Sequence, residues 1–138
     1  MKRFITVTLL GLLAAVVPML AHHSFAAEYD STKPFKLTGA VTKVDWSNPH
    51  VYFYIDVEDA AGKVTSWSME MGAPGALRTS GWTKNTLKIG DVVIVEGTPA
   101  KDGGHHGNAR NVMLASTGQK LGAASSEGQV PAATKGKQ

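Results

Sequence analysis

Apolar and polar residues alternate through the middle of the chain, and this alternation is its strongest pattern. Residues 35–46 and 64–71 place apolar side chains on every second position, and residues 51–57 alternate strictly. A period of two residues predicts β-strands that turn one face toward a core. Turn-forming residues at 47–49 and 59–63 separate the three predicted strands.

The alternation breaks after the third predicted strand. Residues 72–82 contain Pro74 near their start and Gly81 near their end. This arrangement predicts one short helix with proline at its start and glycine just past its end. Alternation then returns in two more predicted strands, which flank a long polar loop: residues 92–97, the loop 99–107, and residues 108–115.

Three strands, a short helix and two further strands are the element order of an OB-fold, a small five-stranded barrel. A β-sandwich or an SH3-like barrel also has short strands at this spacing. The position of the helix between the third and fourth strands favours the OB-like barrel.

The beginning of the chain has the features of a secretory signal peptide. Lys2 and Arg3 precede an uncharged, mostly apolar run over residues 4–20, and Ala21 follows. A transmembrane helix needs about 20 apolar residues, and no basic cluster follows the run. We therefore expect cleavage after Ala21, a periplasmic protein and no stable membrane anchor.

Cleavage after Ala26 or Ala27 is the alternative, and it would remove His22 and His23. The remaining chain divides into a polar lead-in at residues 22–34, the barrel at 35–115 and a tail at 116–138. The tail is rich in Gly, Ala, Ser, Lys and Gln, a composition that predicts disorder.

Composition narrows the chemistry. The chain has no cysteine, which excludes disulfides, thiolate sites and a lipid anchor on cysteine. Its formal net charge is +3, and removal of Lys2 and Arg3 lowers it to about +1. A nucleic-acid-binding domain carries a larger positive excess, so we expect no nucleic-acid partner.

The five histidines lie outside the interiors of the predicted strands and are the first candidate site. In an OB-fold, the loops after the first strand and before the fifth strand flank the ligand face. The predicted loops would therefore bring His50 to the same side as His105 and His106. The other two histidines, His22 and His23, begin the mature chain if cleavage follows Ala21.

Imidazole and amine nitrogens suit copper and other divalent metals. A terminal His22 could chelate one ion through its amine and its ring, with His23 or His50 as a third ligand. The alternatives are structural: His105 and His106 occupy a glycine-rich loop tip typical of solvated residues, and His50 could simply hydrogen-bond its loop.

Two methionines, Met69 and Met71, are spaced two residues apart beside Trp67. Thioethers suit Cu(I), but this spacing is more often core packing.

The aromatic residues offer a second, weaker candidate. Tyr52 and Tyr54 occupy the polar face of the best-defined strand, and Trp46 precedes the turn. Exposed rings on an OB sheet can stack on bases or sugars, although they could equally pack against the lead-in. We find no catalytic constellation, because the serines and acids lack the context of a nucleophile or of an acid–base pair.

Three segments resemble a family of small exported bacterial proteins that is classed as a domain of unknown function. They are a His-His-Ser-Phe start at residue 22, a Trp-x-Asn-Pro-His segment at residues 46–50, and Gly-Asn-Ala-Arg at residues 107–110. The resemblance covers about residues 20–115. It implies export and a small β-domain but no activity, and it favours His22, His23 and His50 over His105 and His106 as ligands.

Two functional hypotheses follow. The first is a periplasmic binding or accessory module without catalysis, which recognises a partner protein or a small ligand. The second is a periplasmic protein that binds copper or another divalent metal through His22, His23 and His50.

Overall fold

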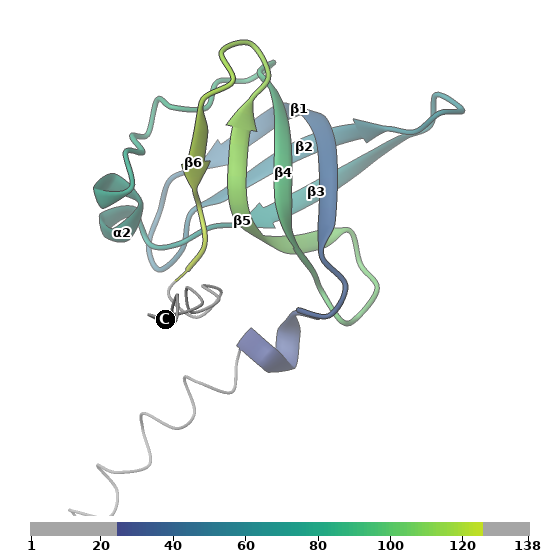
Figure 1. Ribbon diagram of the computed structural model, residues 1–138, viewed down its shortest axis with the longest axis horizontal. Helices are drawn as coiled ribbons and strands as arrows, with labels where there is room; N and C mark the ends of the chain where they lie inside the picture. The colour runs from purple at the N-terminus through teal and green to yellow at the C-terminus, as the bar shows by residue number, and fades with distance from the viewer. Residues whose placement is uncertain (1–24, 126–138) are drawn as a thin grey trace, which may run out of the picture.

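The computed structural model describes residues 25–125. A single helical turn over residues 25–28 precedes the barrel. Six strands and one helix follow it: β1 Phe35–Asp45, β2 Tyr52–Glu58, β3 Val64–Glu70, α2 Pro74–Thr79, β4 Val92–Pro99, β5 His106–Leu114 and β6 Lys120–Gly122 (Figure 1). The described part has no helix long and apolar enough to cross a membrane.

Five strands close into a barrel. Antiparallel pairs join β1 to β2, β2 to β3, β1 to β4 and β4 to β5, and a parallel pairing of β3 with β5 completes the ring. The helix α2 lies between β3 and β4 in the chain. These features are those of an OB-like barrel, so the predicted fold is confirmed over the sandwich and the SH3-like barrel.

The core follows the period-two pattern. Phe53 and Ile55 of β2, Met69 of β3, and Val93 and Val95 of β4 are all fully buried. Burial of each such side chain contributes about 1.5–3 kcal/mol to stability relative to exposure. Alternate residues of the same strands, such as Tyr54, Ser68 and Glu96, face away from this core and are only partly buried.

Glycine allows close approach of the backbone where β4 crosses β5. A β-carbon on Gly97 would lie 2.2 Å from the carbonyl oxygen of Asn108 and 3.1 Å from the ring of Phe35. The β4–β5 register also shifts between Glu96 and Gly97. Such an irregularity bends a strand and helps it follow the wall of a closed barrel.

The folded domain extends further than predicted at the C-terminal side. Residues 116–138 were expected to be disordered, but β6 pairs with β5 and the indole nitrogen of Trp82 donates a 2.7 Å hydrogen bond to the carbonyl of Gly122. Ala123 and Ser125 are buried. The composition of the tail did not predict this ordered segment, because backbone pairing, rather than large apolar side chains, holds most of it in place. Residues 126–138 lie outside the described part.

The described part of the polar lead-in packs against the barrel. Tyr29 is only 4% exposed and forms an isolated β-bridge with Ala100. The amide of Asp30 donates a 2.9 Å hydrogen bond to the carbonyl of Pro99. Residues 25–34 therefore dock against the end of β4 and the loop after it. The strand β5 likewise begins at His106, two residues before the predicted start.

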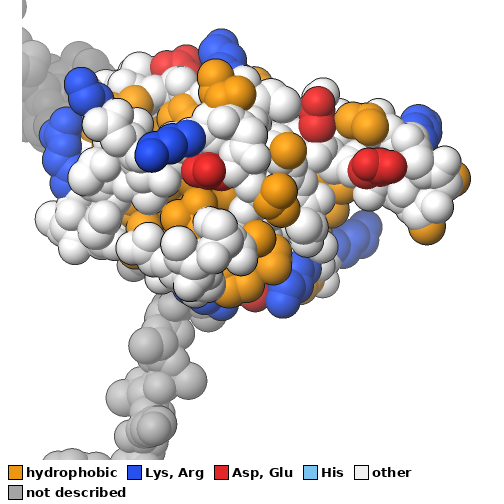
Figure 2. All heavy atoms as spheres, turned by 90° about the horizontal axis from the view of Figure 1, so that it is seen from above, with side chains coloured by type: hydrophobic (Ala, Val, Ile, Leu, Met, Phe, Trp, Pro, Cys, Tyr) orange, Lys and Arg blue, Asp and Glu red, His pale blue; other side chains and the backbone are white. Residues whose placement is uncertain are grey.

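The surface carries charges of both signs. The β2–β3 hairpin projects beyond the barrel in Figure 1, and in Figure 2 this projection and the face beside it bear interspersed basic and acidic side chains. Val64 on the hairpin is 54% exposed. No extended patch of one sign covers the face shown in Figure 2.

Candidate functional site

A buried carboxylate at the end of β3 organises the most elaborate polar cluster in the described part of the chain. Glu70 is 8% exposed. Its Oε2 accepts hydrogen bonds from the hydroxyls of Tyr29, at 2.9 Å, and Tyr52, at 2.7 Å. The Nδ1 atom of His50 lies 3.2 Å from its Oε1. Two segments that are separate in sequence, the lead-in and residues 50–52, therefore meet at a carboxylate carried by a third, β3.

Strand register explains two of these contacts. Tyr52 of β2 stands directly opposite Glu70 of β3, and opposite residues of an antiparallel pair share one face of the sheet. His50 lies just before β2, where Val51 exchanges backbone hydrogen bonds with Met71 and Gly72. These bonds fix the end of the β1–β2 loop beside Glu70.

The third contact comes from the lead-in. The helical turn over residues 25–28 places Phe25 against Tyr29, with 5.0 Å between ring centroids, and the Tyr29 amide donates to the Phe25 carbonyl at 2.8 Å. Lys101 contacts the carbonyl of Ala26 through its Nζ and that of Glu28 through its amide. The lead-in is therefore held both by the barrel end and by Glu70.

Both tyrosines are hydrogen-bond donors at neutral pH. Burial raises the pKa of Tyr29 well above its usual value, and the charge of Glu70 raises it further. Burial also raises the pKa of Tyr52, and its hydrogen bond to Glu70 adds to the effect. The phenols therefore stay neutral, and neither supplies a tyrosinate as a ligand or a nucleophile.

A buried amide extends the cluster onto β5. Asn108 pairs in parallel register with Glu70, and Thr98 of β4 is the neighbour of Asn108 on its other side. Asn108 and Thr98 are each 2% exposed. The Nδ2 atom of Asn108 has no hydrogen-bond partner within residues 25–125. An unpaired buried donor costs about 1–3 kcal/mol, and such a group calls for an explanation such as a bound water or ligand.

The loop histidines lie beside this cluster without joining it. His106 is in register with Ser68 of β3, and its Nε2 lies 2.9 Å from Oδ2 of Asp102. The hydrogen bond from His106 lowers the pKa of the Asp102 carboxyl. The ring of His105 packs 5.3 Å from that of Trp67, centroid to centroid.

No group of three or more His, Cys, Asp or Glu side chains within residues 25–125 is arranged to hold a metal ion. His50 and Glu70 form a pair only. His22 and His23, the other two ligands expected from the sequence, lie outside the described residues. Met69 and Met71 are 0% exposed in the core, so neither of the two presents its thioether at the surface for Cu(I).

The aromatic residues that were predicted as a ligand face all contact other parts of the protein. Trp46 packs against the core, and its Nε1 is buried without a partner among the described residues. The hydroxyl of Tyr52 is bonded to Glu70. The Nζ of Lys43 lies 5.1 Å from the ring centroid of Tyr54.

Sequence reasoning named His50 and Tyr52 but missed Tyr29, Glu70 and Asn108. One signal for Glu70 was present, because it is an acid that alternates with two buried methionines on a strand. Counting back through the predicted hairpin places it opposite Tyr52. No comparable pattern points to Tyr29 or Asn108.

Comparison with known proteins identifies a family but no activity. A model described as "Family of unknown function (DUF6152)" matches residues 10–110. No curated protein matches the sequence. Among solved structures, a mitochondrial single-stranded DNA binding protein from S. cerevisiae is similar, with 10% identity and a TM-score of 0.48. The match covers 60% of this chain and 93% of the yeast protein.

Proposed function

The chain belongs to a family of unknown function, DUF6152, and we propose a function for it from its own residues. It is an exported, non-catalytic binding protein whose ligand is a divalent transition metal ion. The ion is Cu(II) by preference, and its ligands are His50, His22 and His23. This proposal combines the two hypotheses from the sequence, because the ligand of the binding module is then the metal ion.

The observation that carries the proposal is the pairing of His50 with Glu70. A carboxylate 3.2 Å from Nδ1 favours the tautomer that carries its proton on that nitrogen, which leaves the Nε2 lone pair available. Histidines that bind metals almost always hold a carboxylate, carbonyl or water on their other nitrogen. Within residues 25–125, Nε2 of His50 has no hydrogen-bond partner.

The lead-in supports the same reading. Tyr29 is bonded to the carboxylate that positions His50, so Glu70 links the histidine loop to the segment that follows His22 and His23. His23 precedes Phe25 by two residues, a span of about 7.2 Å at most between α-carbons. The chain therefore offers two more imidazoles within a short tether of this end of the barrel.

The available donors favour copper. With no cysteine in the chain and both phenols neutral, the ligands are imidazole nitrogens and, after cleavage, a terminal amine. Nitrogen ligation in a tetragonal arrangement suits Cu(II), which also binds more tightly than Zn(II) or Ni(II) to most sites of this kind.

Packing of the lead-in favours cleavage after Ala21. A cut after Ala26 or Ala27 would remove Phe25, whose ring packs against that of Tyr29 and whose carbonyl accepts the amide hydrogen bond of Tyr29. It would also remove His22 and His23. Export and the position of the cut are both part of the proposal, and the mass of the secreted protein tests them directly.

We expect no nucleic-acid partner. The yeast neighbour is a DNA-binding protein by its name, but a likeness at this level of identity concerns the fold alone. The mature chain is nearly neutral, and the charges in Figure 2 are interspersed. Neither feature provides the positive stripe that follows a phosphate backbone.

Titration of the chain that begins at His22 with Cu(II), by calorimetry and electron paramagnetic resonance, tests the proposal. His50→Ala and the pair His22→Ala and His23→Ala should each weaken binding by at least about tenfold, or about 1.4 kcal/mol. His105→Ala is the matched control and should bind as the wild type does. One glycine added before His22 should also weaken binding, because it displaces the terminal amine.

Equal Cu(II) affinity in the wild type and in His50→Ala would contradict the proposal. The pairing of His50 with Glu70 would then be a structural ion pair only. Nitrogen hyperfine coupling in the resonance spectrum separates imidazole ligation from adventitious binding to carboxylates.

A further inference from the structure

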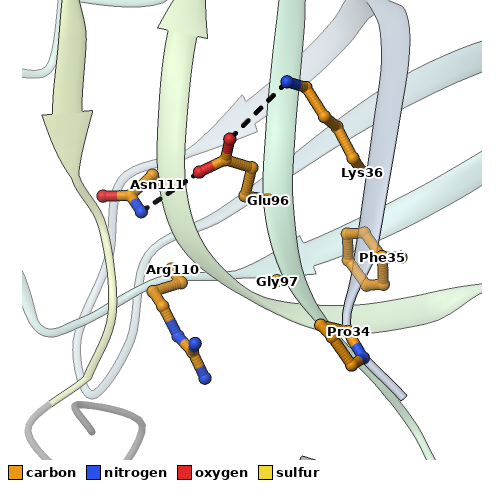
Figure 3. A pocket seen from close by; sticks show the side chains of 7 residues that line it. All are labelled: Pro34, Phe35, Lys36, Glu96, Gly97, Arg110 and Asn111. Atoms are coloured by element: carbon orange, nitrogen blue, oxygen red, sulfur yellow. Dashed lines mark hydrogen bonds and ion pairs between the residues drawn. The ribbon is translucent and has the colours of Figure 1, made fainter.

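A second polar site lies on the outer wall of the barrel and shares no residue with the Glu70 cluster. It is a pocket of about 410 Å³ where β1, β4 and β5 run side by side (Figure 3). Phe35 and Lys36 line one side, Glu96 and Gly97 the middle, and Arg110 and Asn111 the other side. Its volume lies within the usual range for small-molecule sites.

The negative charge of the carboxylate in this pocket is balanced by neighbouring lysines. Glu96 accepts a 2.8 Å hydrogen bond from Nζ of Lys120, and Nζ of Lys36 lies 3.7 Å from its other oxygen. The side-chain amide of Asn111 is 3.4 Å away. The hydrogen bond from Lys120 is the main cause of a lowered pKa at Glu96, so the carboxyl stays ionised. Its oxygens already contact side chains of the protein, which leaves them no role in binding a cationic ligand.

Arg110 stands apart from this network. Figure 3 shows its guanidinium on the far side of the pocket from Lys36, pointing away from Glu96. It is half-buried, and its guanidinium forms no ion pair or hydrogen bond with residues 25–125. Two lysines and one arginine thus surround a single acid, so within residues 25–125 the pocket has a positive excess and one cation without a partner.

The apolar side of the pocket is fixed in place. The ring of Phe35 lies close to Gly97 and Gly107: a β-carbon on Gly107 would lie 2.6 Å from the ring, and one on Gly97 would lie 3.1 Å from it. It also packs 5.7 Å from the ring of Trp67, centroid to centroid. Because Phe35 is held from below and from the side, it presents a rigid surface for an apolar group.

We propose that this pocket binds a small organic carboxylate. The planar guanidinium of Arg110 receives the carboxylate through two parallel hydrogen bonds, and the apolar body of the ligand packs on Phe35. A single uncommitted arginine suits a monoanion better than a phosphate dianion, which needs more donors. The proposal does not depend on metal binding at His50.

Benzoate is a suitable probe, because it combines a carboxylate with a flat apolar ring. Titration of the metal-free chain that begins at His22, followed by amide NMR shifts, should show saturable changes at Phe35, Gly97 and Asn111. A Kd on the order of 1 mM is expected for a ligand of this size. Benzamide has the same shape without the charge and should produce little change. Inorganic phosphate tests the anion without the ring and should bind more weakly than benzoate.

Arg110→Gln should weaken benzoate binding by at least about tenfold. Lys63→Gln removes the same charge at the tip of the β2–β3 hairpin, away from the pocket, and should leave binding unchanged. Glu96→Gln should tighten binding, because it releases Lys36 and Lys120 from their partner. His50→Ala should bind benzoate as the wild type does, which separates this site from the proposed metal site.

Four results would overturn the proposal, and three of them come from the benzoate titrations: equal shifts from benzoate and benzamide, unchanged affinity in Arg110→Gln, or shifts that grow linearly without saturation. An unchanged amide spectrum outside the pocket shows that Arg110→Gln is folded. Tighter phosphate than benzoate binding would replace the carboxylate with a phosphate ligand and would likewise refute the proposal.

Discussion

The hydroxyl of Tyr29 donates a 2.9 Å hydrogen bond to the carboxylate of Glu70, which lies 41 residues further along the chain. This bond connects the lead-in to the third strand of the barrel. The same carboxylate receives Tyr52 and lies beside His50. A substitution at any one of these side chains should therefore alter the contacts of the others.

Replacing Glu70 with Gln should destabilise the metal-free protein by about 1–3 kcal/mol. The amide group of Gln brings a donor to a place where two phenols and an imidazole already approach as donors. Urea unfolding measures the change. Glu58→Gln, at the exposed end of β2, is the control, and its effect should stay below about 0.5 kcal/mol. A wild-type midpoint for Glu70→Gln would contradict the role assigned to the carboxylate.

Tyr29→Phe should loosen the lead-in at a cost of about 1 kcal/mol, because it removes one hydrogen bond and keeps the ring. Hydrogen exchange should accelerate at the amides of Asp30 and Lys101, which bond across the docked lead-in. Tyr54→Phe is the matched control, since its hydroxyl has no hydrogen-bond partner among the described residues. If exchange at these amides is as slow in Tyr29→Phe as in Tyr54→Phe, the lead-in does not depend on Glu70.

The folded protein should lose stability in alkali. Burial raises the pKa of Tyr29 and Tyr52 above their ordinary value of 10.0, so the folded state disfavours the ionised phenols. Their stabilising contribution is complete below about pH 10 and declines as the pH rises through the folded-state pKa, by up to about 1.4 kcal/mol per pH unit for each phenol.

Absorbance of tyrosinate checks this pH dependence. Two of the three tyrosines should ionise only together with unfolding. In the double variant Tyr29→Phe and Tyr52→Phe, the free energy of unfolding should change less steeply above pH 10. Ionisation of all three phenols in a protein that is still folded would contradict the burial of this pair.

A chain that ends at Ser125 should be as stable as the full chain, whereas one that ends at Ala115 should lose more than about 2 kcal/mol. The shorter chain lacks β6, exposes the buried side chain of Trp82 and removes the carbonyl to which its indole bonds. Urea unfolding followed by tryptophan fluorescence measures both differences. Equal midpoints for the two truncations would show that β6 is dispensable.

Most of the barrel could be predicted from sequence because its strands follow a local rule. Phe53 and Ile55 show the alternation that burial of one face requires, and Pro74 and Gly81 mark the limits of the helical segment. The strand β6 follows no such rule. It consists of three residues with one large apolar side chain, and its position depends on β5 and on Trp82.

The candidate site was predictable only in part, for the same reason. His50 is visible as a polar residue at the end of a turn, and the topology of an OB-fold brings that turn to a functional face. Glu70 is the centre of a cluster because Tyr29 of the lead-in bonds to it, and nothing local in the sequence indicates that contact. Asn108 is buried because β5 lies between two other strands at that point.

The parallel pairing of β3 with β5 also sets the order in which the protein can fold. Its partners are separated by 38 residues, as in Ser68 and His106, and β5 must pair with β4 as well. The barrel therefore cannot close until nearly the whole domain is available. A chain that emerges gradually from a ribosome would keep the edge of β3 open until β5 appears. Because its contacts are mostly distant in sequence, this domain should fold within milliseconds to seconds and in a single cooperative step.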